Sequence, residues 1–193
     1  MTDHPASRMS WQRLDIPGRD EASLHRLPDG WVLRGVSQFS NGRVASAFTW
    51  EVEADGEWRA RRGKVLGTGG RRAVDLQIER SGAGTWTVNG MKVPGLAGLL
   101  DLDLGFTPAT NLFPLRRLGL EVGESADAPA AWLDDDRWTL LRLAQRYERR
   151  DQSHYWYESP STGYQGLLTV GDDGFVREYP GLWRAAEGLD FYS

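Results

Sequence analysis

Hydrophobic and polar residues alternate along most of this chain, as they do in half-buried β-strands. In residues 47–54, the apolar side chains of Phe48, Trp50 and Val52 share one face, and polar side chains occupy the other. Residues 73–80 repeat this pattern with a valine, a leucine and an isoleucine. Both segments predict antiparallel strands with one face toward a core.

Turn signals separate these segments about every 10 to 15 positions, a spacing typical of a β-sandwich or roll. One signal is the pair Asn89 and Gly90, which suits the positive φ values of a tight hairpin. The chain therefore predicts one all-β domain over residues 1–193. We expect an antiparallel β-roll or incomplete barrel with little helix, in which residues 1–9 are disordered.

Residues 134–150 fit two structures. Apolar residues from Leu140 to Tyr147 recur at helical spacing, with acids before them and arginines after them, as a helix dipole favours. Alternatively, residues 138–147 form a long strand that pairs through a turn with the aromatic residues of 153–159. Because that aromatic strand needs a neighbour, and the resemblance described below favours β-structure, we predict strand.

Residues 101–124 are too irregular for ordinary core and too apolar for an ordinary loop. Asp101 and Asp103 alternate with leucines, so the two carboxylates should share one face of a strand. Prolines then interrupt the strand because they lack an amide donor. Between the prolines, hydroxyl and amide side chains can bond to the backbone of a turn, as at Thr107, Thr110 and Asn111.

A second strand is predicted after this turn, with the apolar residues from Leu118 to Val122 on its inner face. The same parity places Arg116 inward and Arg117 outward. A buried arginine needs a carboxylate partner, for which Asp101 or Asp103 is the nearest in sequence.

Composition narrows the classes of function. The chain has no cysteine and three scattered histidines, so we expect no metal site and no cofactor. It lacks a signal-like start and a long apolar run, which predicts a cytoplasmic protein without integral membrane contact. The formal net charge of −4 argues against nucleic-acid binding. Nothing in the sequence decides the oligomeric state.

Blocks along nearly the whole chain resemble the bacterial Putative glycolipid-binding family. The similar blocks are DLDL at 101–104, TPATN at 107–111, FPLRRL at 113–118, WRARRGKV at 58–65, WTVNG at 86–90, QRYERR at 145–150 and GFVREYPGLW at 174–183. Ala109 and Phe113 depart from the family pattern, which bears on pocket shape more than on fold. The resemblance implies a spiral β-roll and a binding function.

We therefore expect an apolar or amphiphilic ligand, a glycolipid by the resemblance, to lie inside the roll. An apolar cavity of at least ~300 Å³ should open beside residues 107–117, with Arg116 or Arg117 contacting a polar headgroup. The candidate contacts come from this segment and the similar blocks: Trp58, Arg59, Asp101, Asp103, Thr107, Thr110, Asn111, Arg116, Arg117, Tyr147 and Tyr179.

Two other classes of function stay open. Asp101 and Asp103 would lie ~6.5 to 7 Å apart on a strand, which overlaps the carboxylate separations of glycoside hydrolases. A structural ion pair explains the same residues, and no other catalytic pattern supports an enzyme, so we favour a non-catalytic role. The third class is a structural or interaction protein with a filled core. The basic residues Arg59, Arg61, Arg62 and Lys64 form either a solvated strand or a rim that contacts anions.

Overall fold

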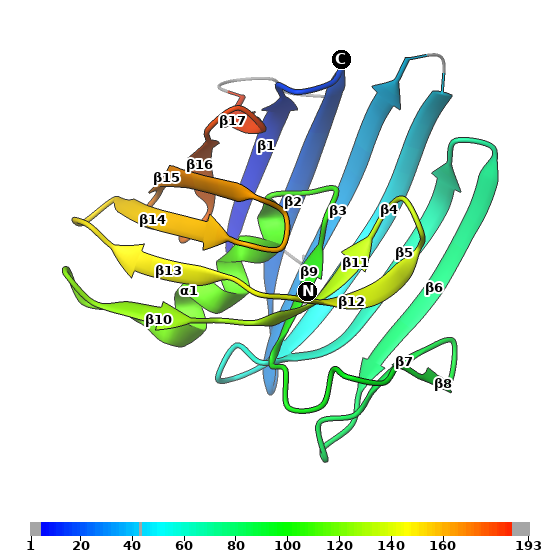
Figure 1. Ribbon diagram of the computed structural model, residues 1–193, viewed down its shortest axis with the longest axis horizontal. Helices are drawn as coiled ribbons and strands as arrows, with labels where there is room; N and C mark the ends of the chain where they lie inside the picture. Colours follow the sequence, from blue (N-terminus) through cyan, green and yellow to red (C-terminus); the bar gives the residue numbers. More distant parts are fainter. Residues whose placement is uncertain (1–4, 43, 187–193) are drawn as a thin grey trace.

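In the computed structural model, which describes residues 5–42 and 44–186, fourteen strands form one curled antiparallel sheet that does not close into a barrel (Figure 1). In spatial order these strands are β10 (Ser125–Asp127), β13 (Arg146–Arg149), β14 (His154–Ser159), β15 (Tyr164–Val170), β16 (Val176–Tyr179), β17 (Trp183–Ala185), β1 (Ser7–Arg13), β2 (Gly18–Leu27), β3 (Gly30–Asn41), β4 (Val44–Asp55), β5 (Ala60–Gly69), β6 (Arg72–Arg80), β7 (Trp86–Val88) and β8 (Met91–Lys92). The all-β prediction is confirmed.

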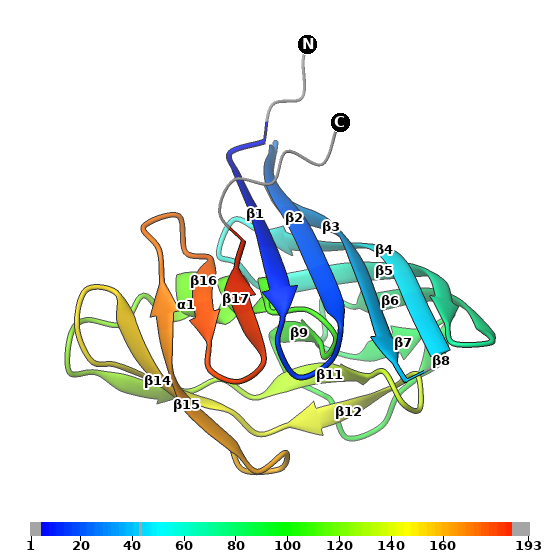
Figure 2. The same ribbon diagram turned by 90° about the horizontal axis from the view of Figure 1, so that it is seen from above.

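A smaller sheet lies against the concave side of the large one (Figures 1 and 2). It contains β12 (Thr139–Leu143), β11 (Ala130–Asp134) and β9 (Asp101–Leu104), and β9 runs parallel to β11. The 3-10 turn η1 (Ala109–Asn111) and the helix α1 (Leu112–Leu118) follow β9. These inner elements place the carboxylates of β9 between the two halves of the large sheet.

The two halves meet where β1 pairs with β17. On one side of this junction the chain runs as a simple meander from β1 to β8, and on the other side it returns from β10 and β13 to β17. The indole nitrogen of Trp11 on β1 donates a buried hydrogen bond of 2.6 Å to the carbonyl of Val176. The junction therefore joins residues from opposite ends of the chain.

The alternating pattern of the long strands gives the expected faces. Phe48, Trp50 and Val52 of β4 are buried, while the residues between them point outward. Asn89 and Gly90 adopt φ values of 49° and 78° in the hairpin between β7 and β8. Both predictions are confirmed, because a period of two leaves one face of each strand for the core.

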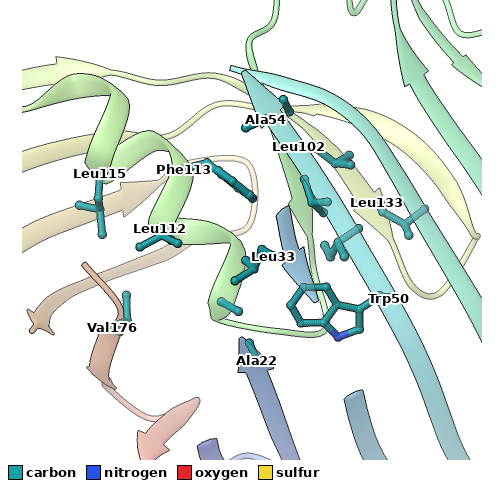
Figure 3. Packing of buried hydrophobic residues seen from close by; sticks show 14 of the residues in the cluster. Ala22, Leu33, Trp50, Ala54, Leu102, Leu112, Phe113, Leu115, Leu133 and Val176 are labelled. Atoms are coloured by element: carbon teal, nitrogen blue, oxygen red, sulfur yellow. The ribbon is translucent and has the colours of Figure 1, made fainter. Parts of the chain in front are cut away.

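Side chains fill the space inside the curl (Figure 3). Leu112, Phe113 and Leu115 of α1 pack there with Leu102 of β9 and Leu133 of β11. All five residues are buried. The concave side therefore carries a packed hydrophobic core.

The helix α1 contains Arg116 and Arg117, to which the sequence assigned the parity of a second strand. Its first turn contains Pro114, which is tolerated there because the first amides of a helix have no intrahelical partner. Gly119 ends the helix in the left-handed region at φ 55°, and its amide donates to the carbonyl of Leu115 at 3.3 Å. The predicted strand from Leu118 to Val122 is wrong.

The strand prediction for residues 134–150 is confirmed, with one difference. The segment forms two short strands, β12 in the small sheet and β13 in the large sheet, interrupted at Ala144 and Gln145. The strand β13 pairs with β14 as expected. At the other end of the chain, β1 begins at Ser7, so the expected disorder of residues 1–9 is wrong for 7–9, and residues 1–4 lie outside the described part.

Within the described residues, no helix combines the length and the apolar character needed to cross a bilayer.

Candidate functional site

The carboxylate of Asp101 is held by Arg117, which reaches across from α1. Arg117 donates hydrogen bonds of 3.1 Å from Nε and 2.6 Å from an Nη atom to the two oxygens of Asp101. Asp101 is only 1% exposed. This bidentate geometry is the strongest that arginine forms with a carboxylate.

The sequence predicted Arg116 for this buried position, and that prediction is wrong. Arg116 is exposed, donates 3.2 Å to the carbonyl of Asp172, and lies 5.9 Å from the ring of Trp58. Strand parity assigned the two arginines, but successive residues of a helix are turned by about 100°. In the helix, Arg117 faces β9.

Asp103 shares the polar face of β9 with Asp101, as predicted from the alternation. Burial raises the pKa of Asp103 to about 7, and the negative charge of Asp101 adds to this effect. Within the described residues the carboxyl group of Asp103 has no hydrogen bond or ion pair, although part of the surface of Asp103 remains accessible. Asp103 is thus a deep carboxyl group with no fixed partner.

Tyrosines cover the same face of β9. Tyr147 donates a hydrogen bond of 2.6 Å to Asn111, and its ring lies 4.9 Å from that of Tyr157. The ring of Tyr179 lies 5.7 Å from that of Tyr157. Burial raises the pKa values of all three tyrosines, and the charge of Asp103 raises them further. The structure therefore brings Tyr147, Tyr179 and Asn111 together on the side of Asp103.

The two threonines of the segment bond to the backbone, as turn residues do. The Oγ1 atom of Thr110 accepts 3.3 Å from the amide of Leu104, and Oγ1 of Thr107 accepts 3.3 Å from the amide of Ala109. Both side chains are buried. They hold the connection between β9 and η1 and present no free surface to a ligand.

Trp58 and Arg59 lie in the turn between β4 and β5, and the ring of Trp58 lies 5.9 Å from the guanidinium group of Arg116 and 6.4 Å from the ring of Phe113. The ring of Trp58 stacks on that of Trp31 at 4.6 Å, and its backbone adopts a left-handed φ of 64°. Arg59 is paired with Asp55 at 2.8 Å and with Glu57 at 2.6 Å. Among the predicted site residues, Trp58 therefore lies near Arg116, whereas Tyr147, Tyr179 and Asn111 lie on the side of Asp103.

A cavity of about 710 Å³ adjoins Arg59, and we call it the arginine pocket. Its lining comes from the start of β5, the end of β6, the following turn and β7. Its lining residues are Asp55, Arg59, Arg61, Arg62, Glu79, Arg80, Ser81, Gly82, Thr85, Thr87 and Leu100. Four arginines and three hydroxyl groups thus surround one space.

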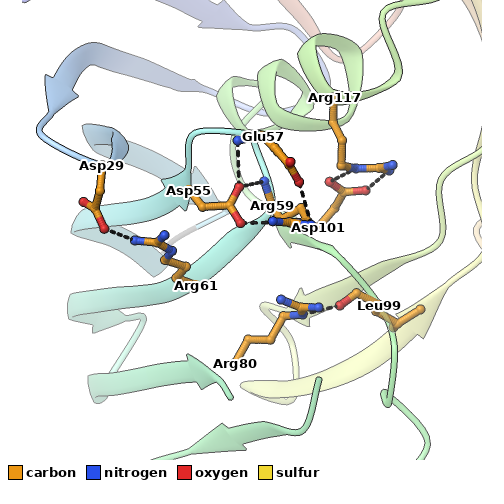
Figure 4. A network of polar contacts seen from close by, with 9 residues as sticks. All are labelled: Asp29, Asp55, Glu57, Arg59, Arg61, Arg80, Leu99, Asp101 and Arg117. Carbon is orange, nitrogen blue, oxygen red and sulfur yellow. Dashed lines mark hydrogen bonds and ion pairs between the residues drawn. The ribbon is translucent and has the colours of Figure 1, made fainter. Parts of the chain in front are cut away.

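Fixed ion pairs shape one wall of the arginine pocket (Figure 4). Burial acts to raise the pKa of Asp55, but hydrogen bonds from the Arg59 side chain and from backbone amides hold it below its ordinary value. Arg61 pairs with Asp29 at 2.5 Å, and this hydrogen bond lowers the pKa of Asp29. These acids remain charged at neutral pH and keep the arginines in place.

The sequence identified three arginines of this pocket and missed Arg80. The β5–β6 hairpin places Glu79 opposite Arg62, which carries Arg80 to the same end of the sheet. This proximity of Arg80 to the other arginines results from the register of the hairpin. A search for basic residues at the ends of predicted hairpins would have included Arg80.

A family model described as Putative glycolipid-binding matches residues 8–185 of this chain. The chain belongs to this family. The crystal structure of a DUF1089 family protein from Pseudomonas aeruginosa is similar, with 27% sequence identity, coverage of 95% of each chain and a TM-score of 0.71. Among curated proteins, none matches the chain.

Four cavities in the described part of this member of the Putative glycolipid-binding family, of about 290 to 710 Å³, contain no residue of 101–124. None of these four is the cavity expected beside residues 107–117. The helix α1 fills the predicted space with Leu112 and Phe113. The arginine pocket lies instead next to the start of β9, since Leu100, the residue before β9, forms part of its lining.

Asp101 and Asp103 of this family member also differ from the two catalytic carboxyl groups of a glycoside hydrolase. Such a dyad needs two carboxyl groups that reach the substrate from one open cleft. Asp103 is unpaired and carries a raised pKa, as a general acid would, but both oxygens of Asp101 are bonded to Arg117. Asp101 therefore acts as the partner of an arginine in this geometry.

Proposed function

We propose that this protein binds an amphiphilic ligand with a sugar-bearing headgroup, and that the arginine pocket holds the headgroup without catalysing a reaction. The observation that carries the proposal is the pocket itself, in which four guanidinium groups and three hydroxyl groups surround about 710 Å³. The family name points to the same class of ligand.

The chemistry of the lining suits a polyhydroxylated headgroup. Guanidinium groups donate hydrogen bonds to sugar oxygens, and the hydroxyls of Ser81, Thr85 and Thr87 both donate and accept. On the same walls, the carboxylate of Glu79 can accept hydrogen bonds from sugar hydroxyls. The volume lies within the range of ordinary small-molecule sites.

The packed core has a consequence for the apolar part of the ligand. An acyl chain buried in an interior cavity adds about 0.8 kcal/mol for each methylene group. Here Leu112, Phe113 and Leu102 already occupy the interior. We therefore propose that the headgroup supplies most of the affinity and that the chain stays at the mouth of the pocket.

Calorimetric titration with three compounds tests this proposal. They are glucose, octyl glucoside and dodecyl glucoside, and the two alkyl glucosides are kept below their critical micelle concentrations. We expect measurable binding of the glucosides, little dependence on chain length, and loss of binding in Arg59→Ala. The control Arg142→Ala changes an exposed arginine on β12, outside the pocket lining, and should bind as the parent does. No binding, or equal binding by both variants, contradicts the proposal.

The filled interior favours a second candidate, a structural or interaction protein. In that case none of the glucosides binds, and substitutions in the arginine pocket change stability alone. The same titrations, combined with thermal melts of the two variants, therefore separate the two functions.

A further inference from the structure

We propose that the arginine pocket selects ligands that carry an oxyanion, a phosphate, sulfate or carboxylate group, and that Arg80 binds this group. The inference rests on the proposed function, since it takes the arginine pocket as the headgroup site. It goes further by assigning a charge to the headgroup and a residue to its recognition.

Three of the four arginines in the pocket already have carboxylate partners. Arg59 is bonded to Asp55 and Glu57, Arg61 lies 2.5 Å from Asp29, and Arg62 lies 3.2 Å from Glu53. Their positive charges are largely balanced inside the protein. They shape the pocket more than they attract an anion.

Arg80 is different. Its Nε atom donates 2.8 Å to the carbonyl of Leu99, and within the described residues it has no carboxylate within ion-pair distance. Burial raises the pKa of Asp101, and the charges of Arg117 and Arg80 offset part of this rise, but both oxygens of Asp101 are bonded to Arg117 (Figure 4). The charge of Arg80 therefore remains available to a ligand.

The side chain of Arg80 is also held in place before a ligand arrives. The carbonyl of Leu99 that accepts from Arg80 accepts a second bond, at 3.2 Å, from the indole of Trp86. Trp86 is completely buried, so this acceptor is fixed in the core. A guanidinium group anchored through Nε presents its remaining Nη donors as a planar fork, which matches two oxygens of an oxyanion.

The turn after β6 offers further donors beside this fork. A Cβ built on Gly84 would lie 3.9 Å from an Nη atom of Arg80, so the backbone of this turn passes close to the guanidinium group. Ser81 and Thr85 stand on the same turn, and Thr87 follows on β7. An oxyanion on Arg80 therefore lies within a polar wall of hydroxyl groups, while its sugar ring faces the paired arginines.

Titration with three probes tests the inference: lysophosphatidylinositol, which carries a polyhydroxylated inositol ring and a phosphate, octyl glucoside, which is neutral, and inorganic phosphate. We expect lysophosphatidylinositol to bind at least about tenfold more tightly than octyl glucoside. Arg80→Gln should abolish this preference, Arg80→Lys should retain part of it, and Arg142→Gln should leave it unchanged. Equal affinity for the two amphiphiles in the parent overturns the inference and leaves the proposed function standing.

Two further outcomes separate the sources of the anion. If inorganic phosphate binds as tightly as lysophosphatidylinositol, the oxyanion site is correct and the proposed glycolipid headgroup is wrong. If no probe binds, both proposals fail. If Arg80→Gln does not fold, the salt dependence of binding by the parent protein tests the role of a charge. The preference of the parent for lysophosphatidylinositol should fall when the salt concentration is raised from about 50 to about 200 mM. A preference that is independent of salt overturns the role of a charge.

Discussion

Arg117 and Asp101 form a bidentate ion pair that joins the inner helix α1 to the first residue of β9. The carboxylate is 1% exposed, so either charge would be costly without the other. The pair holds the start of β9, the strand that also carries Asp103. The neighbouring residue on the helix, Arg116, is exposed and bonds to the backbone carbonyl of Asp172.

We predict that Arg117→Ala lowers the free energy of unfolding by about 3 to 5 kcal/mol, because it leaves the carboxylate of Asp101 buried without a partner. Arg116→Ala should cost much less, since Arg116 is exposed. Urea unfolding of the two variants measures both values. Equal losses would mean that the ion pair contributes no more than an ordinary surface contact.

Asp103 should make stability depend on pH. Its pKa is raised to about 7 from 3.8, so the native protein binds this proton more tightly than the unfolded chain does. Stability from this group is therefore present at low pH and is lost as the pH rises from about 4 to about 7. Asp103→Asn removes the ionisation and should be more stable than the parent at pH 8, by at most about 4 kcal/mol.

Thermal melts of Asp103→Asn and its parent between pH 4 and pH 8 check this prediction. Asp20, whose pKa is also raised to about 7, affects both proteins equally and cancels in the difference. Asp29→Asn serves as a control of opposite sign, because Arg61 lowers the pKa of Asp29. A constant difference between parent and Asp103→Asn across this range would contradict the assignment.

Trp58 allows a test of backbone strain. Its φ of 64° suits glycine, and the ring is held by stacking on Trp31. Both Trp58→Ala and Trp58→Gly lose the stacking, but we predict that the glycine variant is the more stable of the two by about 1 kcal/mol. The order of stability should reverse at Trp31, an ordinary strand residue of β3, where the alanine variant should be more stable than the glycine variant.

The contact between β5 and β9 can be tested at Gly63. A Cβ there would lie 2.5 Å from Cδ2 of Leu102, so Gly63→Ala should displace a buried leucine and destabilise the protein by about 1 to 3 kcal/mol. Gly56→Ala is the matched control, because a Cβ at Gly56 meets no atom within 4 Å. Equal melting temperatures for the two variants would show that β9 adjusts freely.

The strands and the faces of their side chains could be predicted from the sequence because each depends on local alternation. Asp101 and Asp103 share a face for this reason, and the Asn89–Gly90 hairpin follows from two residues that tolerate positive φ. Such features need no knowledge of distant parts of the chain.

The helix α1 and the arginine pocket depend on more than local pattern. Pro114 interrupts a strand and also suits the first turn of a helix, so its presence alone does not choose between them. The assignment of Arg116 and Arg117 failed with that choice. Arg80 reaches the pocket through the register of two strands, which the sequence around it does not specify. The filled interior likewise follows from where α1 packs, and alternation cannot locate it.

The pairing of β1 with β17 also sets the order in which the large sheet can be completed during synthesis. Trp11 and Val176, which are bonded across this junction, are separated by 165 positions. On a ribosome that adds about 5 to 20 residues each second, the outer edge of β1 stays without its partner for on the order of 10 s or longer. An unpaired strand edge is a template for other chains, so the newly made protein passes through an aggregation-prone interval that ends only when β17 emerges.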